Sequence, residues 1–419
     1  MKRWRIKLLL LCSSLAVALT TVEVGLRLAG FSRPYFYTFD EELGWDLRPD
    51  VSGWFRKEGG AYIHINSSGR RDDRQYTTTK PNDTFRIAII GDSYAEAMQV
   101  PVAQTFWSVL ERELGKCPVL SMRAEVLNFG VSSYGTAQEL MMLRKHVWAF
   151  SPDVVLLAFA SVNDVRNNSR QLEQDDLRPY FVFQNGELVA DMSFRDSPRF
   201  RQKQSRLNQT IYRLINHSRL LQLINGVRDD LLTRRAISQG RYQGATTETA
   251  EIGVDDKVYQ EPTDQAWKQA WQVTEALLSQ MNKEVTARGA KFMVVTLTAG
   301  PQVRPDASGR QSYMARLGVT DLFYPERRIQ AVAEREHFPI LTLAPVFMEY
   351  ANEHRVALHG FDNNLNLGHW NAEGHRLAGE RISQRLCELI AADHSKTNQE
   401  EIAGDQGVTS MDTAHKRGN

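Results

Sequence analysis

The chain has 419 residues, of which 42% have hydrophobic side chains, so it is long enough to bury a full core and to contain more than one structural unit. Lysine and arginine together number 51 and aspartate and glutamate 50, which gives a net charge of +1. This balance excludes a strong overall field that would attract nucleic acid or anionic substrates, and we expect no nucleic-acid partner.

The first 30 residues have the pattern of a membrane segment. Four basic residues precede an uncharged run over residues 8–22, and the apolar pattern continues beyond Glu23 and Arg27. Such a run is short for a hydrocarbon core about 30 Å thick, which needs about 20 residues. A helix through residue 29 is long enough if both charges lie near the outer interface.

The alternative is a cleaved signal peptide, because residues 16–18 (Ala-Val-Ala) have the form of a cleavage site. We favour an uncleaved signal anchor in residues 1–30 that attaches the chain to the inner membrane, because the apolar pattern runs past that site. Both alternatives place the chain from residue 31 onward outside the cytoplasm, and cleavage would make the protein secreted.

Residues 31–84 are rich in aromatic and turn residues and have no helical period, which predicts a β-rich lead packed on the main domain. Three strand-then-helix units follow, with apolar strands that begin at residue 85, at residue 125 and at residue 153. Repeated units of this kind predict a parallel sheet covered by helices on both faces. The helices after the first two strands are predicted at about residues 105–114 and 137–150.

The regular alternation stops over residues 165–263, which we interpret as an inserted cap that could roof the functional site. Asn185-Gly186 between alternating apolar residues predicts a β-hairpin, and an amphipathic helix is predicted at about residues 209–232. A basic stretch over residues 199–206 could contact lipid head groups or an acidic glycan, but a solvated loop is the simpler interpretation.

The alternation resumes over residues 264–391, and a helix with an apolar stripe ends at Gly289. We predict a strand at about residues 291–297, a helix at about 325–336, a second strand at about 340–343 and a final helix that ends at about residue 391. Residues 392–419 are polar and without period, which predicts a disordered tail. We therefore expect an α/β fold, a flavodoxin-like three-layer α/β/α sandwich with a five-stranded parallel sheet, whose core is residues 85–164 and 264–391.

Polar residues follow the predicted strands. Ser93 comes after the first strand, a turn of small residues after the second, Asn163 after the third and His369 after the fifth. Because parallel strands end at one edge of a sheet, we expect these groups to meet there. A hydroxyl, an imidazole and several N–H donors are the parts of an acyl-transfer site. His375, a rival for the base, is expected to pack within the final helix.

This pattern resembles the SGNH, or GDSL-like, hydrolase superfamily, and within it the bacterial membrane-attached members. The first sequence block of the superfamily matches as Gly91-Asp92-Ser93, the third as Ser161-Val162-Asn163-Asp164, and the fourth as Gly368-His369. The resemblance implies that Ser93 is the nucleophile and His369 the base. It also implies that the backbone N–H of Ser93 and the side-chain amide of Asn163 bind the oxyanion.

The chain departs from the superfamily pattern at two positions. In the second block the glycine aligns with Ser133 while Gly130 lies nearby, and we expect one of these two to supply a further backbone donor. Three residues before His369, where the superfamily has Asp, the chain has Asn366. The group that orients the imidazole is therefore open between Asp362, Asn366 and a backbone carbonyl.

The remaining ligand and redox chemistry is sparse. Neither cysteine nor histidine pairs have metal-ligand spacing with a carboxylate partner, so we expect no metal and no cofactor. Cys117 ends the first predicted helix and Cys387 lies in the last one, two elements on one face of the sheet, where a disulfide and two separate buried thiols are both open.

The expected function is an extracytoplasmic serine esterase that acts on an ester-bearing small molecule or glycan, with O-acyl or O-acetyl groups of carbohydrate as the expected substrate. One alternative is an O-acyltransferase that uses the same residues to modify a cell-envelope or exported polysaccharide. Another is a non-catalytic glycan-binding protein on the same scaffold, which the missing acid at Asn366 encourages.

Overall fold

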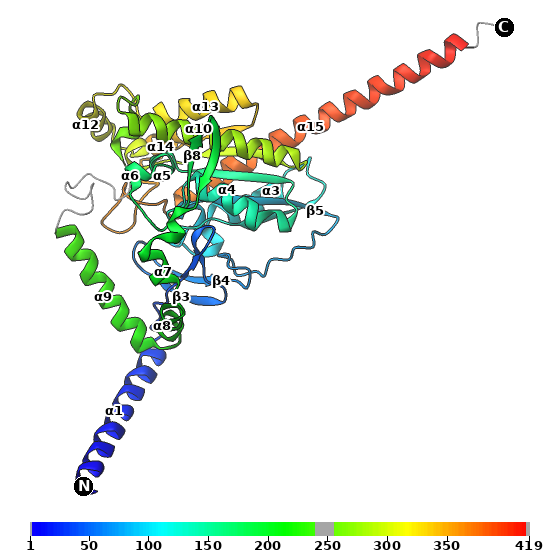
Figure 1. Cartoon of the computed structure of the whole chain (residues 1–419). Helices are drawn as coiled ribbons and strands as arrows, with labels where there is room; N and C mark the ends of the chain where they lie inside the picture. The colour runs from blue at the N-terminus through cyan, green and yellow to red at the C-terminus, as the bar shows by residue number, and fades with distance from the viewer. Residues whose placement is uncertain (1, 239–254, 416–419) are drawn as a thin grey trace.

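A five-stranded parallel sheet forms the centre of the protein (Figure 1). The structure is a computed structural model and describes residues 2–238 and 255–415. The order across the sheet is β6-β5-β7-β10-β11, which is the flavodoxin-like order predicted. The strands are β5 (Thr84–Gly91), β6 (Arg123–Asn128), β7 (Val154–Phe159), β10 (Lys291–Thr296) and β11 (Ile340–Thr342).

Helices cover both faces of this sheet because successive strand residues point to opposite sides. Ile90 and Leu157 belong to one buried core, whereas their neighbours Ile89 and Leu156 belong to the other. The first core is closed by α4 (Thr136–Lys145), α10 (Gln265–Ala287) and α13 (Tyr324–Glu336). The second is closed by α3 (Phe106–Leu114), α14 (Leu343–His354) and α15 (Ala372–His415). The predicted three-layer sandwich is therefore confirmed.

The predicted β-rich lead consists of two antiparallel hairpins that pack into the first core. They are β1 (Tyr37–Asp40) with β2 (Gly44–Leu47), and β3 (Val51–Phe55) with β4 (Ala61–Ile65). Arg71, just after the second hairpin, is buried and its guanidinium donates to the carbonyl groups of Glu96, Ala97 and Val100. These bonds join the lead to the segment after β5, so the lead and the sheet form one packed unit.

The inserted segment contains the predicted hairpin, β8 (Tyr180–Gln184) and β9 (Glu187–Asp191). Its two-residue turn has positive φ angles of 52° at Asn185 and 85° at Gly186, as a type I′ turn requires.

Further short helices occur along the chain. They are α5 (Ser161–Asn167), α6 (Arg170–Glu173), α7 (Pro198–Gln204), α11 (Gly300–Val303), α12 (Ala307–Leu317) and four 3-10 turns at 102–104, 147–150, 193–196 and 256–259.

The amphipathic helix predicted at about 209–232 is two helices, α8 (Arg206–His217) and α9 (Arg219–Ser238). The break lies at Ser218, which is extended and whose hydroxyl accepts a hydrogen bond from the N–H of Leu221 as the cap of α9. Both helices lie at the end of α1 (Lys2–Leu28) (Figure 1), and the role of a cap over the site stays a prediction. The part at 239–254 lies outside the described residues.

The ends of the chain differ from each other in character. Residues 3–28 of α1 are long and apolar enough to cross a membrane, with a mean hydropathy of 1.9, and none of that span is buried. At the other end α15 continues to His415, where we expected a disordered tail after residue 391. Residues 392–415 contain no proline and many helix-forming side chains, which allows the continuation. Residues 416–419 lie outside the described chain.

A disulfide joins α15 to the turn that follows α3. Cys117 and Cys387 are bonded, with their Cα atoms 5.8 Å apart and a sequence separation of 270. Of the two alternatives left open by the sequence, the structure thus contains the disulfide.

Candidate active site

Ser93 lies where β5 ends, at the first position of the short helix α2 (Ser93–Glu96). Asp92 caps this helix, because its Oδ1 accepts a hydrogen bond from the N–H of Tyr94 at 2.9 Å. Its other oxygen, Oδ2, accepts from Nδ2 of Asn163 at 3.0 Å. Strands β5 and β7 are neighbours in the sheet, so the residues after them meet at the point where the strand order reverses.

His369 connects Ser93 to a carboxylate. Its Nε2 lies 2.8 Å from Oγ of Ser93, and its Nδ1 lies 2.5 Å from Oε2 of Glu58. The backbone N–H of His369 donates to the other carboxylate oxygen, Oε1, at 2.8 Å. An ionised carboxylate only accepts hydrogen bonds, so Nδ1 carries the proton and Nε2 is free to accept the proton of the serine hydroxyl. The three side chains have the arrangement of a Ser-His-acid triad.

Glu58 takes the place that we expected Asp362 or Asn366 to take. Both of these residues lie in the loop before His369 with positive φ angles, 51° and 68°, and the N–H of Asn366 donates to the carbonyl of His359. The backbone of Asn366 therefore bonds within its own loop, while the imidazole of His369 bonds to the lead at Glu58. The acid therefore comes from a segment 311 residues away in sequence.

Two glycines allow the close approaches around Glu58 and His369. Glu58 lies in the turn between β3 and β4, followed by Gly59 with φ 62°, where a Cβ atom would lie 2.4 Å from the carbonyl oxygen of Gln99. Gly368 has φ 74°, and a Cβ atom there would lie 2.1 Å from Oε1 of Glu58. Only glycine tolerates these backbone angles together with such close approaches.

The electrostatic surroundings keep Glu58 ionised. Partial burial raises the pKa of Glu58, but the hydrogen bonds from His369 and its charge lower the pKa by more. The net pKa of Glu58 therefore lies below the usual 4.5. About a quarter of each side chain of the Glu58–His369 pair is exposed. An ionised acid beside Nδ1 stabilises the imidazolium that forms when the ring accepts a proton.

A second, buried histidine holds the backbone around His369. Nδ1 of His359 lies 2.8 Å from the carbonyl oxygen of Gly368, and its Nε2 lies 2.8 Å from Oγ1 of Thr298. That hydroxyl also accepts from Nε1 of Trp370 at 2.7 Å. Burial lowers the pKa of His359 to about 4, so this ring is neutral at neutral pH and donates from Nδ1. The network fixes the two residues that flank His369.

Among the predicted oxyanion donors, the structure separates Gly130 from the others. The amide of Asn163 donates one of its protons to Asp92, the residue before Ser93, which fixes its orientation. The N–H of Gly130 donates to Oδ1 of Asn128 at 2.9 Å inside the protein, so it is already engaged. Ser133 is exposed and has φ 63°, the conformation that glycine would favour, and we retain it as the candidate second backbone donor.

The loop that carries Ser133 is held by the lead and by α2. Nε1 of Trp45 donates to the carbonyl of Ser132 at 3.1 Å, and the hydroxyl of Ser132 donates to the carboxylate of Glu96. Tyr37 donates to the same carboxylate at 3.1 Å. Burial raises the pKa of Glu96 to about 7 although these donors lower it. The lead therefore contacts the site at the acid and at the oxyanion loop.

Two other candidates lie outside this site. His375 is buried in α15, where its Nδ1 accepts from the N–H of Phe106 at 3.3 Å and its ring stacks on that phenyl ring. This agrees with the packing role expected for it. Within residues 2–238 and 255–415 the structure contains no group of three or more His, Cys, Asp or Glu side chains placed to hold a metal ion.

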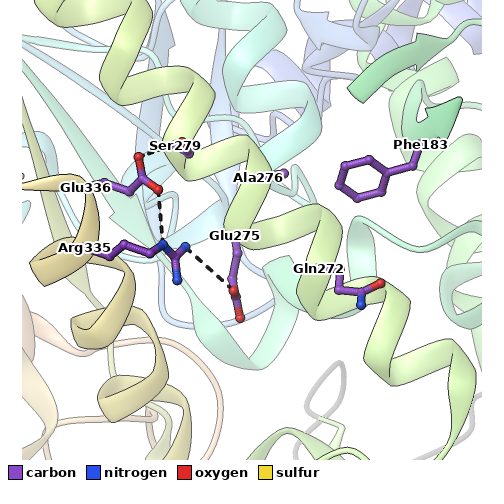
Figure 2. A pocket seen from close by; sticks show the side chains of 7 residues that line it. All are labelled: Phe183, Gln272, Glu275, Ala276, Ser279, Arg335 and Glu336. Atoms are coloured by element: carbon purple, nitrogen blue, oxygen red, sulfur yellow. Dashed lines mark hydrogen bonds and ion pairs between the residues drawn. The ribbon is translucent and has the colours of Figure 1, made fainter. Parts of the chain in front are cut away.

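A surface cavity of about 500 Å³ lies against α10, α13 and the β8–β9 hairpin, away from the triad (Figure 2). Arg335 crosses it and pairs with Glu336 at 3.2 Å and with Glu275 at 3.9 Å. Because the charges that border the cavity already pair with one another, we assign no chemistry to it.

No family model and no curated protein matches the chain. Solved structures that it resembles include an α/β hydrolase enzyme from the metagenome of Lake Arreo, Spain, with 15% identity and a TM-score of 0.36 over 74% of this chain and 99% of the other. An acetyl xylan esterase has 12% identity and a TM-score of 0.36 over 73% and 98% of the two chains. A variant of an acetyl xylan esterase from Geobacillus stearothermophilus has 12% identity and a TM-score of 0.35 over 74% and 96%. These TM-scores lie below 0.5, and the assignment of function therefore rests on the geometry of the site.

Proposed function

We propose that the protein is a serine esterase, anchored in a membrane and active outside the cytoplasm, that hydrolyses O-acyl esters of carbohydrate. The observation that carries the proposal is the continuous hydrogen-bonded path from Oγ of Ser93 through His369 to Glu58. A serine hydroxyl is a weak nucleophile unless a base within hydrogen-bond reach accepts its proton, and here that base is itself held in the correct tautomer.

The reaction follows from these contacts. Oγ of Ser93 attacks the ester carbonyl while Nε2 of His369 takes the hydroxyl proton. The tetrahedral intermediate collapses, the bond to the alcohol breaks, and the imidazolium gives its proton to the departing alcohol oxygen. A water molecule then repeats the sequence on the acyl-enzyme, which releases the acid and restores the serine.

The negative charge of the intermediate would be bound by the N–H of Ser93, the amide of Asn163 and the N–H of Ser133. The amide of Asn163 is preorganised because Asp92 fixes its orientation at 3.0 Å. Loss of one such donor typically lowers kcat about 10²- to 10³-fold. We therefore expect Asn163→Ala to fall in that range while Ser93→Ala loses nearly all activity.

Two features support the location of the enzyme. Helix α1 has the length and hydropathy of a membrane span, with four basic residues at its start, the arrangement typical of a segment whose N-terminus stays in the cytoplasm. The disulfide between Cys117 and Cys387 is of a kind that persists in oxidising compartments. Together they favour a catalytic domain on the outer side of the membrane.

The preference for carbohydrate rests on the resemblance to SGNH hydrolases and on one surface feature. The hairpin that carries Glu58 also presents Trp54 and the half-exposed Tyr62, with ring centroids 5.6 Å apart, and Arg56 lies over the tryptophan ring. Aromatic rings with polar groups at their edges provide surfaces that are apolar and hydrogen-bonding at once. This platform would guide a glycan towards the triad.

The test is turnover of p-nitrophenyl acetate by the full chain in detergent, together with labelling by a serine-directed fluorophosphonate. We expect both in the wild type and neither in Ser93→Ala. Equal turnover in the two chains would refute a catalytic Ser93. Absence of labelling in the folded wild type would favour a non-catalytic glycan-binding protein. The main argument for that alternative was the lack of an acid near His369, and Glu58 removes this argument. Product analysis with and without an oligosaccharide acceptor separates hydrolysis from acyl transfer.

A further inference from the structure

We propose that α8 and α9 form a second membrane contact, lying on the lipid surface beside α1 with one face of each helix in the lipid interface. The proposal rests on the membrane anchor proposed for α1 and is independent of the esterase chemistry. It is carried by the way the anchor is bonded to these helices and by the side chains that they leave exposed.

The two charged residues near the C-terminal end of α1, Glu23 and Arg27, hold the junction of α8 and α9. The carboxylate of Glu23 accepts hydrogen bonds from the hydroxyl of Ser218 at 2.9 Å and from the N–H groups of Arg219 and Leu220 at 3.0 and 2.9 Å, which caps the start of α9. Nη2 of Arg27 donates to the carbonyl of His217, the last residue of α8, at 2.7 Å.

These bonds fix the level of the junction relative to the membrane. Glu23 lies five residues before the end of α1 at Leu28, which is about 8 Å along the helix axis. The start of α9 and the end of α8 are thus held beside the last turns of the anchor rather than above them. In Figure 1 both helices meet α1 at its upper end, and α9 runs from there obliquely, upward and to the left.

Helix α8 has one face on the protein and one face exposed. Tyr212 stacks on Tyr35 of the lead with ring centroids 4.5 Å apart, and Asn216 bonds both to the N–H and to the carbonyl of Tyr35. The opposite face carries three apolar side chains at spacings of four and three residues, which share one helix face. They are Leu207, Ile211 and Leu214, with exposed fractions of 71%, 42% and 56%.

Helix α9 is less strictly two-sided than α8. Its inner face binds Arg33, whose guanidinium pairs with Asp230 at 2.7 and 2.9 Å and whose N–H donates to Gln222 at 2.8 Å. The outer side carries the exposed Arg228 together with exposed apolar side chains, namely Leu221, Ile224, Val227, Leu231 and Leu232. Exposed apolar rows of this size on two adjoining helices are unusual on a surface that faces only water.

Charge and position select a lipid surface as the occupant. Residues 206–238 contain six arginines and two aspartates, and one of these aspartates, Asp230, pairs with Arg33. Amphipathic helices with apolar rows and excess arginine bind the interface of membranes that contain anionic lipid, where the long side chains reach the head groups. The apolar rows adjoin α1, whose own apolar side chains are exposed in the protein and would be covered by lipid in a membrane.

The experiment places a fluorescent probe on these rows in the full chain, reconstituted in vesicles of phosphatidylcholine and phosphatidylglycerol. Cys12 is the free cysteine of the chain and lies in α1, so the wild type labelled there reports the anchor. Leu214→Cys and Ile224→Cys, each with Cys12→Ser, report the two rows. Glu353→Cys in the same background is the control, because its side chain is exposed on α14. Lipids carry a nitroxide quencher either near the head group or near the end of the acyl chain.

We expect the head-group nitroxide to remove more than about half of the emission at positions 214 and 224, at the depth of about 5–10 Å typical of interfacial helices, and to leave the probe at 353 unchanged. Cys12 lies about 16 Å along the axis from Glu23 and should be quenched more by the deep nitroxide. Quenching at Cys12 without quenching at 214 and 224 would overturn the second contact and leave the anchor intact. A probe at 214 or 224 that has the emission of an apolar surrounding but is not quenched by either nitroxide would assign the rows to a protein partner or a second copy. This result would also overturn the proposed lipid contact. No quenching at Cys12 would refute the anchor, whereas turnover of p-nitrophenyl acetate tests the esterase separately.

Discussion

Replacing Glu58 by glutamine tests the acid that the structure places at His369. The carboxylate accepts two hydrogen bonds from this residue, one from Nδ1 at 2.5 Å and one from the backbone N–H at 2.8 Å. A glutamine has one carbonyl oxygen, which the backbone N–H would occupy, so that its NH₂ group faces Nδ1. The ring must then accept at Nδ1 and carry its proton on Nε2, where it cannot take the proton of Ser93.

The magnitude follows from this tautomer. In Ser-His-Asp enzymes an amide in place of the acid lowers kcat about 10⁴-fold with the geometry intact. The Glu58–His369 pair is partly exposed, so water screens part of the effect, and we expect Glu58→Gln to lose about 10³- to 10⁴-fold in kcat, about 4–5.5 kcal/mol of barrier. KM should change little, because Glu58 does not contact the ester.

The assay is p-nitrophenyl acetate turnover by the full chain, with thermal unfolding as the measure of folding. Asp362→Asn is the matched control, because it removes a carboxylate from the loop before His369 without touching Nδ1, and it should retain activity within about threefold. Nearly wild-type kcat in Glu58→Gln, with Ser93→Ala inactive, would show that the acid does not act and would refute the reasoning. A large loss in Asp362→Asn would return the orienting role to that loop.

Three further changes should have measurable effects. Gly368→Ala puts a Cβ atom 2.1 Å from Oε1 of Glu58 and should lower kcat strongly. Gly318→Ala is the control, because Gly318 has a similar φ of 69° but lies in open space, and it should lower the melting temperature without lowering kcat. Equal kcat in the two variants would contradict the close approach. The pKa of His359 is about 4 in the folded protein and 6.5 when unfolded, so the unfolded chain binds more protons between these pH values. Acidification from pH 6.5 to 4 should therefore lower the unfolding free energy by up to about 3 kcal/mol. His359→Gln should not lose this part of the stability, which urea unfolding of both chains measures. Cys117→Ser with Cys387→Ser should lower the unfolding free energy by up to about 5.5 kcal/mol, the chain-entropy limit for a loop of 270 residues, with kcat unchanged at room temperature. An unchanged melting temperature would contradict this.

Much of the fold follows from local patterns in the sequence. The apolar runs before Ser93 and Asn163 are buried on both faces, so nearly every residue in them is hydrophobic, and their position and parallel order can be predicted without partners. The Asn185-Gly186 turn is equally local, because positive φ at two successive residues restricts the choice of side chain. The break at Ser218 is less visible, since the amphipathic pattern continues through it and only the capping hydroxyl marks it.

The acid could not be found in the same way. Glu58 stands in a charged turn, Arg56-Lys57-Glu58-Gly59-Gly60, that looks like any solvated hairpin loop, and its partner is 311 residues away. The available signals were the paired glycines after it and the glycine before His369, but a single sequence does not indicate that two such positions approach each other. A pattern search near the histidine could only return Asp362 and Asn366, because it assumes that the acid is local.

The position of Glu58 changes what the lead does. The lead follows the proposed anchor, packs against α8 through Tyr35, and also provides the acid and, through Trp45, a bond to the oxyanion loop. A sheet core cut at residue 85 would keep the serine, the histidine and Asn163 but would lose the carboxylate that sets the tautomer of the histidine. The proposed membrane anchor and the proposed catalytic acid therefore reside in one continuous segment, so that a displacement of the lead from the sheet would uncouple His369 while leaving the fold of the sheet intact.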